Sequence, residues 1–190
     1  MKSKKKNKIV FICTGNTCRS PMAAELFKRE VSSLGLQSLI VCSAGIQANE
    51  NGQMNEKSKC VLQENGLSGQ DFHSTQINED LVQESLAIVC MTETHKDFMM
   101  DFRWNVLRGL GAKRIENNVY SFKDIVGYDI PDPYGKDLET YRYVFQLLEV
   151  GMPALKEKIL TEKVIAKLLK IPKTGEKKTR KKTVKKIENT

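Results

Sequence analysis

The segment that most constrains the fold is an apolar run at residues 8–13 (KIVFIC), followed within a few residues by the start of a helix. A nearly continuous apolar run is typical of a parallel strand that is covered on both faces. Ser20 suits a helix N-cap, Pro21 suits the first helical position, and Gly35 favours the end of that helix. The sequence therefore predicts a buried strand, a tight turn and a helix, which is the opening of an α/β fold.

The remainder of the chain continues this alternation. Further strands are expected at 39–42 and 86–91, and a fourth is best placed within 112–122; helices are expected at 54–64, 78–84, 93–103 and from Leu138 onward. In the last helix Tyr141, Val144, Phe145 and Leu148 share one face. Gly151-Met152-Pro153 predicts an interruption or a kink there. The expected fold class is α/β, with a four-stranded parallel sheet flanked by helices and a loop for phosphate after the first strand.

The charge of the chain is concentrated at its two ends. The net charge is +8, yet residues 1–8 carry five lysines and no acid, and residues 171–190 carry eight Lys/Arg and two Glu, which leaves −3 for residues 9–170. We expect a basic tail at 1–8, a folded domain at 9–160, a helical extension at 161–170 and a disordered basic tail at 171–190. A mildly acidic body does not suggest a nucleic-acid surface. The tails are expected to be solvated extensions, and weak electrostatic contact with acidic partners, anionic lipid or nucleic acid is the alternative.

Several classes of protein are excluded by composition. No run of 18 apolar residues occurs, so no membrane span is expected, and a cytoplasmic location is the simplest expectation. The cysteines are odd in number and no Cys-x2-Cys pair occurs, which predicts neither a disulfide framework nor a zinc site. We expect no metal and no organic cofactor. The apolar surroundings of Cys42, Cys60 and Cys90 predict core positions.

The turn after the first predicted strand carries the chemistry. It reads CTGNTCRSP, from Cys13 to Pro21. A strand–helix turn gathers unpaired backbone N–H groups at the positive end of a helix dipole, and such a nest binds phosphate-like anions. Gly15 and Asn16 tolerate the left-handed backbone angles that turn amides inward. The same environment favours a thiolate at Cys13, and Arg19 can hold two phosphoryl oxygens.

This segment resembles the Cys-x5-Arg-Ser phosphate loop of the low-molecular-weight protein tyrosine phosphatases. The resemblance extends from about Lys8 to about Leu160, so that the folded domain at 9–160 is expected to be a phosphatase domain. It implies a cysteine-dependent protein phosphatase that works through a phosphocysteine on Cys13, with a phosphorylated protein as its partner. The loop residues that it places around the phosphate are Thr14, Gly15, Asn16, Thr17, Cys18, Arg19 and Ser20.

The family also needs a general acid in an Asp-Pro motif. Asp132-Pro133 supplies that motif just before the last predicted helix, and Pro131 and Pro133 restrict the backbone around the acid. The acid is expected to protonate the leaving group and then, as a carboxylate, to activate water. Asp124 and Asp129 are nearby alternatives.

The resemblance assigns supporting roles to further residues. Ser20 resembles the serine that hydrogen-bonds the cysteine sulfur, and Asn16, Ser43 and His73 resemble a polar network that shapes the loop. An ordinary loop histidine is the alternative for His73. Tyr134 is expected to form an aromatic wall of the pocket, or else to pack within its loop. Cys18 resembles a cysteine that traps the nucleophile as a reversible disulfide, the alternative being a small buried residue.

The substrate is left open between two phosphorylated side chains. Thr17 stands where many tyrosine-directed members carry an aliphatic residue, and threonine there resembles the bacterial branch that acts on protein phosphoarginine. A hydroxyl can hydrogen-bond a guanidinium, whereas a phenyl ring prefers an aliphatic wall. Phosphoarginine and phosphotyrosine therefore both remain candidates. An arsenate reductase of the same fold and a non-catalytic phosphate-binding module are the alternative functions.

Overall fold

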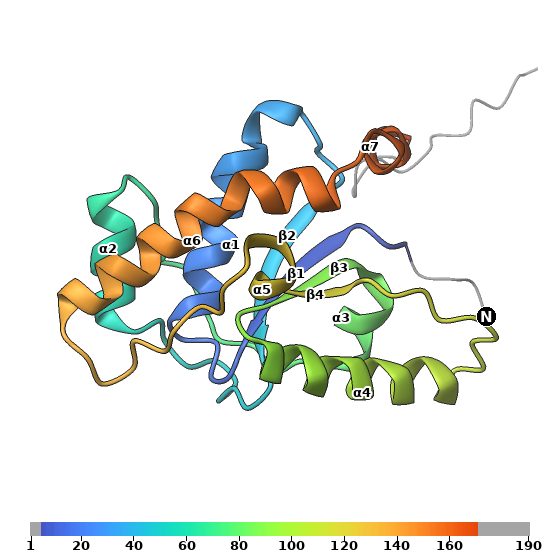
Figure 1. The fold of residues 1–190 in the computed structure, drawn as a ribbon, viewed down its shortest axis with the longest axis horizontal. Helices are drawn as coiled ribbons and strands as arrows, with labels where there is room; N and C mark the ends of the chain where they lie inside the picture. Colours follow the sequence, from blue (N-terminus) through green and yellow to red (C-terminus); the bar gives the residue numbers. More distant parts are fainter. Residues whose placement is uncertain (1–4, 171–190) are drawn as a thin grey trace, which may run out of the picture.

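A four-stranded parallel sheet forms the centre of the protein (Figure 1). The computed structural model describes residues 5–170. The strands run in the spatial order β2-β1-β3-β4 and comprise β1 Lys8–Cys13, β2 Ile40–Gly45, β3 Ser85–Cys90 and β4 Val119–Ser121. The helices are α1 Arg19–Val31, α2 Glu56–Glu64, α3 Glu79–Glu84, α4 Glu93–Gly109, α5 Phe122–Val126, α6 Leu138–Ile159 and α7 Glu162–Leu169, with a 3-10 turn η1 at Ser32–Leu34. The expected fold class is confirmed.

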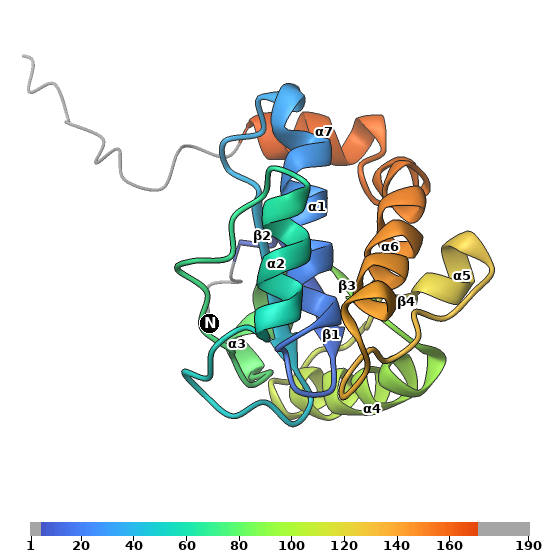
Figure 2. The ribbon, with the colours of Figure 1, turned by 90° about the vertical axis from the view of Figure 1, so that its left-hand side faces the viewer.

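Helices cover both faces of this sheet. Figures 1 and 2 place α1 and α6 together on one face and α4 on the other. The side chains of β1 alternate accordingly: Ile9 and Phe11 belong to the core under α1 and α6, whereas Val10 and Ile12 belong to the core under α3 and α4. Because both faces are covered, β1 can be apolar along its whole length, as its sequence predicts.

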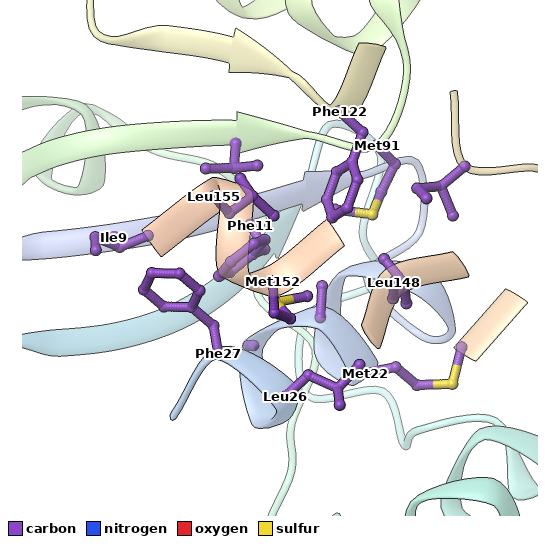
Figure 3. Close-up of a cluster of buried hydrophobic side chains, with 14 of the residues drawn as sticks. Ile9, Phe11, Met22, Leu26, Phe27, Met91, Phe122, Leu148, Met152 and Leu155 are labelled. Carbon is purple, nitrogen blue, oxygen red and sulfur yellow. The ribbon is translucent and has the colours of Figure 1, made fainter. Parts of the chain in front are cut away.

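The larger core lies between the sheet and the pair α1 and α6. Figure 3 shows Phe11 of β1 facing Phe27 of α1, with Met152 and Leu155 of α6 beside them. The two phenyl rings lie 5.5 Å apart between centroids at an interplanar angle of 59°, a tilted geometry that suits aromatic quadrupoles. This packing fixes α1 against β1.

The predicted elements are found, with shifted boundaries. The second strand extends to Gly45, so that Ser43-Ala44-Gly45 lies within β2 rather than after it. Helix α4 continues six residues past its expected end at 103 and reaches Gly109. The short helix α5 was not predicted; it begins with a capping box between Ser121 and Asp124.

The predicted interruption at Gly151-Met152-Pro153 is wrong. Helix α6 runs unbroken through Pro153, which lies on the exposed face of the helix. Met152 and Leu155 are buried on the opposite face. Burial of that face on both sides of the proline stabilises the helix by more than the one hydrogen bond that the proline removes.

The start of α1 also differs from expectation. The helix begins at Arg19, with Cys18 as N-cap, so Ser20 is the second helical residue and caps nothing. The helix ends at Val31, and Gly35 follows the 3-10 turn with a left-handed φ of 61°. The hydroxyl of Ser20 is thereby left for another partner, which is described below.

The ends of the folded part differ slightly from the expected limits. Asn7 is already buried, and its side-chain amide donates to the Ser38 carbonyl at 2.5 Å. At the other end α7 occupies the range expected for a helical extension and packs on the body, where the Ser38 hydroxyl donates to the Leu168 carbonyl at 2.7 Å. Residues 171–190, for which disorder is predicted, lie outside the described range, and so do residues 1–4. Between residues 5 and 170 no helix is long and apolar enough to cross a membrane.

Candidate active site

The loop between β1 and α1 meets a helix end that no side chain caps. Cys13 is the last residue of β1 and Arg19 the first of α1. Asn55, Asn78, Thr92, Ser121 and Asp137 each cap their own helix with a side-chain oxygen, whereas α1 has neither a side-chain cap nor an acidic residue in its first turn. Its first amides and its positive dipole end are therefore available to an external anion.

Cys13 lies at the base of this loop with a hydroxyl on its sulfur. The thiol is only 3% exposed, and its Sγ lies 3.0 Å from the Ser20 Oγ. The Asn16 side-chain amide donates to the same Oγ at 2.9 Å, and the Ala44 carbonyl lies farther away at 3.5 Å. The hydroxyl proton of Ser20 therefore points most favourably at the sulfur, where it stabilises a thiolate.

Asn16 holds the shape of the loop from its centre. Its φ is +54°, and it is fully buried. The side-chain amide donates to Ser20 and to the Ser43 Oγ, each at 2.9 Å, and the side-chain oxygen accepts from the Thr75 backbone N–H at 2.8 Å. All the hydrogen-bonding groups of this amide except one lone pair are thus engaged, which fixes its orientation.

His73 does not take part in this network. The partners of the Asn16 side chain within residues 5–170 are Ser20, Ser43 and Thr75, and His73 is exposed. It is the Thr75 backbone amide, two residues along, that occupies the expected place. A backbone N–H can make this contact whatever side chain the residue carries, so the residue type at position 75 could not predict it.

The end of β2 supports the loop from below. The backbone amides of Ile46 and Gln47 donate to the carbonyls of Cys13 and Thr14 at 3.0 and 2.9 Å. A Cβ on Gly45 would lie 2.5 Å from the Thr14 carbonyl oxygen and 3.0 Å from the Asn16 nitrogen. A side chain at position 45 would therefore push the loop out of shape.

Arg19 and Asp132 form an ion pair above the loop. The Arg19 Nη2 lies 2.7 Å from the Asp132 Oδ2, and the Nη1 donates to the Ile130 carbonyl at 3.3 Å. Arg19 is buried, whereas the Asp132 side chain is half exposed. The acid loop and the phosphate loop therefore meet at the guanidinium, and the carboxylate reaches the solvent from which a substrate arrives.

The two alternative acids are engaged elsewhere. Asp124 forms the capping box of α5 and an ion pair of 2.8 Å with Lys96, and these contacts lower the pKa of its carboxyl despite partial burial. Asp129 accepts from the Glu93 backbone N–H at 3.1 Å, at the start of α4. Of the three carboxylates, Asp132 is the one that contacts Arg19.

Tyr134 lies at the rim of the site. Its backbone N–H donates to the Asp132 Oδ1 at 3.1 Å, which closes an Asx turn around the acid. Its side chain is 71% exposed. An aromatic ring that is this exposed next to the acid is free to contact a substrate, and no packing within its own loop is needed to explain its position.

His95 is a buried contact of the loop that the sequence did not reveal. Its Nε2 lies 3.0 Å from the Thr14 Oγ1 and its Nδ1 lies 2.6 Å from the Thr92 Oγ1. Burial, and then the positive charge of Arg19, lower the pKa of the imidazole from 6.5 to about 4. The ring is therefore neutral at pH 7, with one nitrogen as donor and the other as acceptor. The sequence does contain a clue to this contact. Thr92 is a typical N-cap residue directly after β3, and the carboxyl ends of parallel strands lie at the same edge of the sheet, so a side chain near Thr92 is expected near the loop after β1.

The remaining cysteines fall into distinct environments. The Cys18 Sγ lies 3.5 Å from the Tyr141 hydroxyl and 3.6 Å from the Thr17 Oγ1. Cys90 is fully buried in the core, as expected, and burial raises the pKa of its thiol strongly. The core assignment is wrong for Cys60, which is only partly buried and donates to the Glu64 carboxylate at 3.5 Å. Cys42 is partly buried and packs against the core that contains Val10 and Ile12.

Between residues 5 and 170 no three His, Cys, Asp or Glu side chains come together as ligands for a metal ion. The charged groups of the site are the Arg19 guanidinium and the Asp132 carboxylate, and they are joined by the Cys13 thiol, the neutral His95 and the hydroxyls of Ser20 and Ser43. This set suits the capture of a phosphoryl group and its transfer to sulfur.

Comparison with known proteins agrees with this geometry. Residues 8–165 match the family model of the low molecular weight phosphotyrosine protein phosphatases. A protein-arginine-phosphatase of Geobacillus stearothermophilus is 34% identical over 155 residues, covering 82% of this chain and 97% of the relative. A probable low molecular weight protein-tyrosine-phosphatase, AmsI of Erwinia amylovora, is 29% identical over 75% of this chain and 90% of its own length.

Solved structures of such proteins superpose on this fold. The YwlE arginine phosphatase from Geobacillus stearothermophilus has a TM-score of 0.68 at 32% identity, covering 83% of this chain and 95% of its own. A YwlE arginine phosphatase mutant with a phosphorylated active-site serine has a TM-score of 0.71 at 27% identity, covering 83% and 99%. The family-model match spans the phosphate loop and the acid loop alike. The chain belongs to the low molecular weight phosphotyrosine protein phosphatase family.

Proposed function

We propose that this protein is a cysteine-dependent protein phosphatase that hydrolyses phosphoarginine through a phosphocysteine on Cys13. The observation that carries the proposal is the meeting of Cys13, Arg19 and Asp132 at the uncapped start of α1, where Arg19 contacts the acid at 2.7 Å. A phosphoryl group seated on the loop amides would face the sulfur from one side, with the carboxylate on the side of the leaving group.

The first step transfers the phosphoryl group to sulfur. The Cys13 thiolate attacks phosphorus, an S–P bond forms, and the bond from phosphorus to the leaving atom breaks. Its electron pair stays on the leaving atom, which takes a proton from Asp132. Arg19 and the loop amides hold the charge on the equatorial oxygens.

The second step returns the enzyme to its starting state. Asp132, now a carboxylate, accepts a proton from water as the water oxygen attacks phosphorus. The S–P bond breaks and its electron pair returns to the sulfur. The Ser20 hydroxyl, 3.0 Å from that sulfur, stabilises the departing thiolate. Inorganic phosphate is released.

Thr17 favours phosphoarginine as the substrate. Thr17 is partly buried at the loop; its Oγ1 lies 3.6 Å from the Cys18 Sγ, and a Cβ built on Gly15 would lie 3.8 Å from the same oxygen. A hydroxyl there can accept a hydrogen bond from a guanidinium, which an aliphatic side chain cannot do. The relatives named protein-arginine-phosphatase, at 34% and 31% identity, support the same choice.

Phosphotyrosine is the second candidate, and Tyr134 favours it. An aromatic side chain that is 71% exposed beside the acid offers a stacking surface for a phenyl ring. The arsenate reductase alternative lacks support, because Cys90 is fully buried in the core and cannot relay a disulfide. A phosphate-binding module without catalytic activity would not need an acid, so the contact of the Asp132 carboxylate with Arg19 argues against that alternative.

A competition assay tests the choice. Equal amounts of a phosphoarginine peptide and a phosphotyrosine peptide are given to the purified protein and to Thr17→Ile, and kcat/KM is compared, with Cys13→Ser as the inactive control. We expect the wild type to prefer phosphoarginine and Thr17→Ile to shift the ratio toward phosphotyrosine by about tenfold or more. A wild type that prefers phosphotyrosine, or a ratio unchanged in Thr17→Ile, would reject the role of Thr17.

A further inference from the structure

A cavity lies at the opposite edge of the sheet from the phosphate loop. It has a volume of about 380 Å³ and is enclosed by the amino ends of β3 and β4, the end of α6, the helix α7 and one side chain of α4. In Figure 1 α7 lies at the far side of the molecule from the turn between β1 and α1. A six-residue strand separates the two edges by about 20 Å, so the cavity is not part of the active site.

Positive charge dominates the lining of this cavity. Its cationic residues are Lys6, Arg103, Lys158, Lys163 and Lys167, and its one acidic residue is Glu116. Within residues 5–170 none of these five cations lies within ion-pair distance of a carboxylate. Within the described part of the chain, the cavity lining therefore carries five positive charges against the single negative charge of Glu116, which attracts Lys6 and Arg103 without forming an ion pair with either.

Arg103 is the centre of this imbalance. It is only 4% exposed, and its Nη2 donates to a backbone oxygen, that of Glu116, rather than to a carboxylate. Its Nε is buried and has no hydrogen-bond partner among residues 5–170. A buried guanidinium without an ion-pair partner is costly: burial lowers the pKa of Arg103, and the attraction of the more distant Glu116 opposes this only in part. An anion in the cavity would relieve that cost.

Two neighbouring groups add to this picture. Asn118 donates its side-chain amide to the carbonyls of Ser85 and Leu86 at 3.0 and 3.2 Å, which fixes its orientation and leaves its buried Oδ1 without a partner in the described residues. Lost hydration, and then repulsion from Arg103, lower the pKa of the Lys6 ammonium; Glu116 opposes this shift and Lys167 adds to it. The lining of the cavity thus contains a donor without a hydrogen-bond partner in the described residues, the Arg103 Nε, and an acceptor without one, the Asn118 Oδ1. Mutually repelling cations lie beside them.

We propose that this cavity is a second anion-binding site, which takes a small molecule bearing a phosphoryl or diphosphoryl group. Arg103 would hold the phosphoryl oxygens at the base, with Lys6 and Lys167 neutralising the remaining charge at the rim. The Asn118 Oδ1 would accept from a hydroxyl or amine of the same ligand. The volume admits a ligand of metabolite size.

A titration followed by two-dimensional NMR of backbone amides tests the site and separates it from the active site. The full-length protein is titrated at about 0.15 M NaCl with inorganic pyrophosphate, ADP and adenosine in separate arms. We expect pyrophosphate or ADP, and not adenosine, to shift the amides of Asn118, Tyr120 and Val164 with a Kd below about 1 mM. Stronger binding of ADP identifies a nucleotide-like ligand, and equal binding identifies the phosphoryl group alone.

Variants decide whether the cavity is responsible. Lys167→Glu reverses an exposed charge at the rim, and Arg108→Glu makes the same change on an exposed residue of α4 outside the cavity. We expect Kd to rise at least about fivefold in Lys167→Glu and to stay within about twofold in Arg108→Glu; Arg103→Met should abolish the shifts if it folds. Shifts confined to Gly15 and Thr17 in the phosphate loop, or equal Kd values in the two glutamate variants, would overturn the proposal.

Discussion

Replacing Asp132 with asparagine should change binding and turnover in opposite directions. The Asp132 carboxylate lies 2.7 Å from the Arg19 Nη2, which is a group that a phosphoryl oxygen also needs. The Asp132→Asn substitution would keep the shape of the side chain but remove its charge. An oxyanion would then meet an arginine without a competing carboxylate.

The size of the effect follows from the exposure of the pair. The Asp132 side chain is 52% exposed, so solvent screens it and an interior dielectric does not apply. Two unit charges about 5 Å apart in water repel by about 0.8 kcal/mol. Removing that repulsion should tighten the binding of phosphate or vanadate about fourfold, and more for a dianion.

Turnover should fall at the same time because the proton donor is lost. General acids contribute about 10²–10⁴-fold, and the full loss should appear with phosphoarginine, whose leaving guanidine must be protonated. An activated aryl phosphate with a weakly basic leaving group should lose less. The assay compares kcat/KM for both substrates, which reports transfer to sulfur and not the shared hydrolysis of the phosphocysteine, and the inhibition constant of vanadate in wild type and Asp132→Asn. Equal loss of kcat/KM for both substrates, or weaker vanadate binding, would contradict this prediction.

Three further predictions concern the support of the loop. Since the His95 pKa falls from 6.5 to about 4, unfolding takes up a proton between these pH values, and the wild type should lose about 1–2 kcal/mol of unfolding free energy from pH 6.5 to about pH 5. Denaturant titrations should show that His95→Asn lacks this slope and that exposed His73→Asn retains it; identical slopes in all three proteins would contradict the assignment. Ser20→Ala should slow phosphocysteine hydrolysis more than its formation, seen as a larger pre-steady-state burst, and an unchanged burst would argue against its contact with the sulfur. Gly45→Ala should lower the free energy of unfolding by about 1–3 kcal/mol and remove most of the activity, because the new Cβ would lie 2.5 Å from the Thr14 carbonyl oxygen. Gly109→Ala, whose Cβ would meet open space, should change neither quantity. A Gly45→Ala protein that is stable and active would contradict the close approach.

The fold could be predicted because local patterns and global packing agree. The apolar run of β1 indicates coverage on both faces, and the structure provides it with α1, α6 and α4. Where a local sequence pattern and the packing of the fold favour different structures, the packing determines which one forms. Pro153 should end a helix by its local chemistry, yet the buried face that includes Met152 and Leu155 carries α6 through it.

The loop of the site was readable because its requirements fall on side chains. A left-handed turn favours asparagine at 16, and a guanidinium suited to phosphate requires arginine at 19. The Thr75 amide and the Gly45 approach involve backbone atoms, which leave little trace in one sequence. His95 was missed for another reason: its partner Thr14 is 81 residues away, and only the sheet order brings them together.

The central claim is that Cys13 carries the phosphoryl group during turnover. The most direct test mixes the protein with a phosphoarginine peptide, quenches the reaction with acid within milliseconds, and locates the phosphoryl group by mass spectrometry of the digested protein. The account predicts one added phosphoryl group on the peptide that contains Cys13, formed and lost at rates that support kcat, and none in Cys13→Ser under the same brief mixing. Turnover with no phosphoryl group on Cys13, or with the group on another residue, would contradict it.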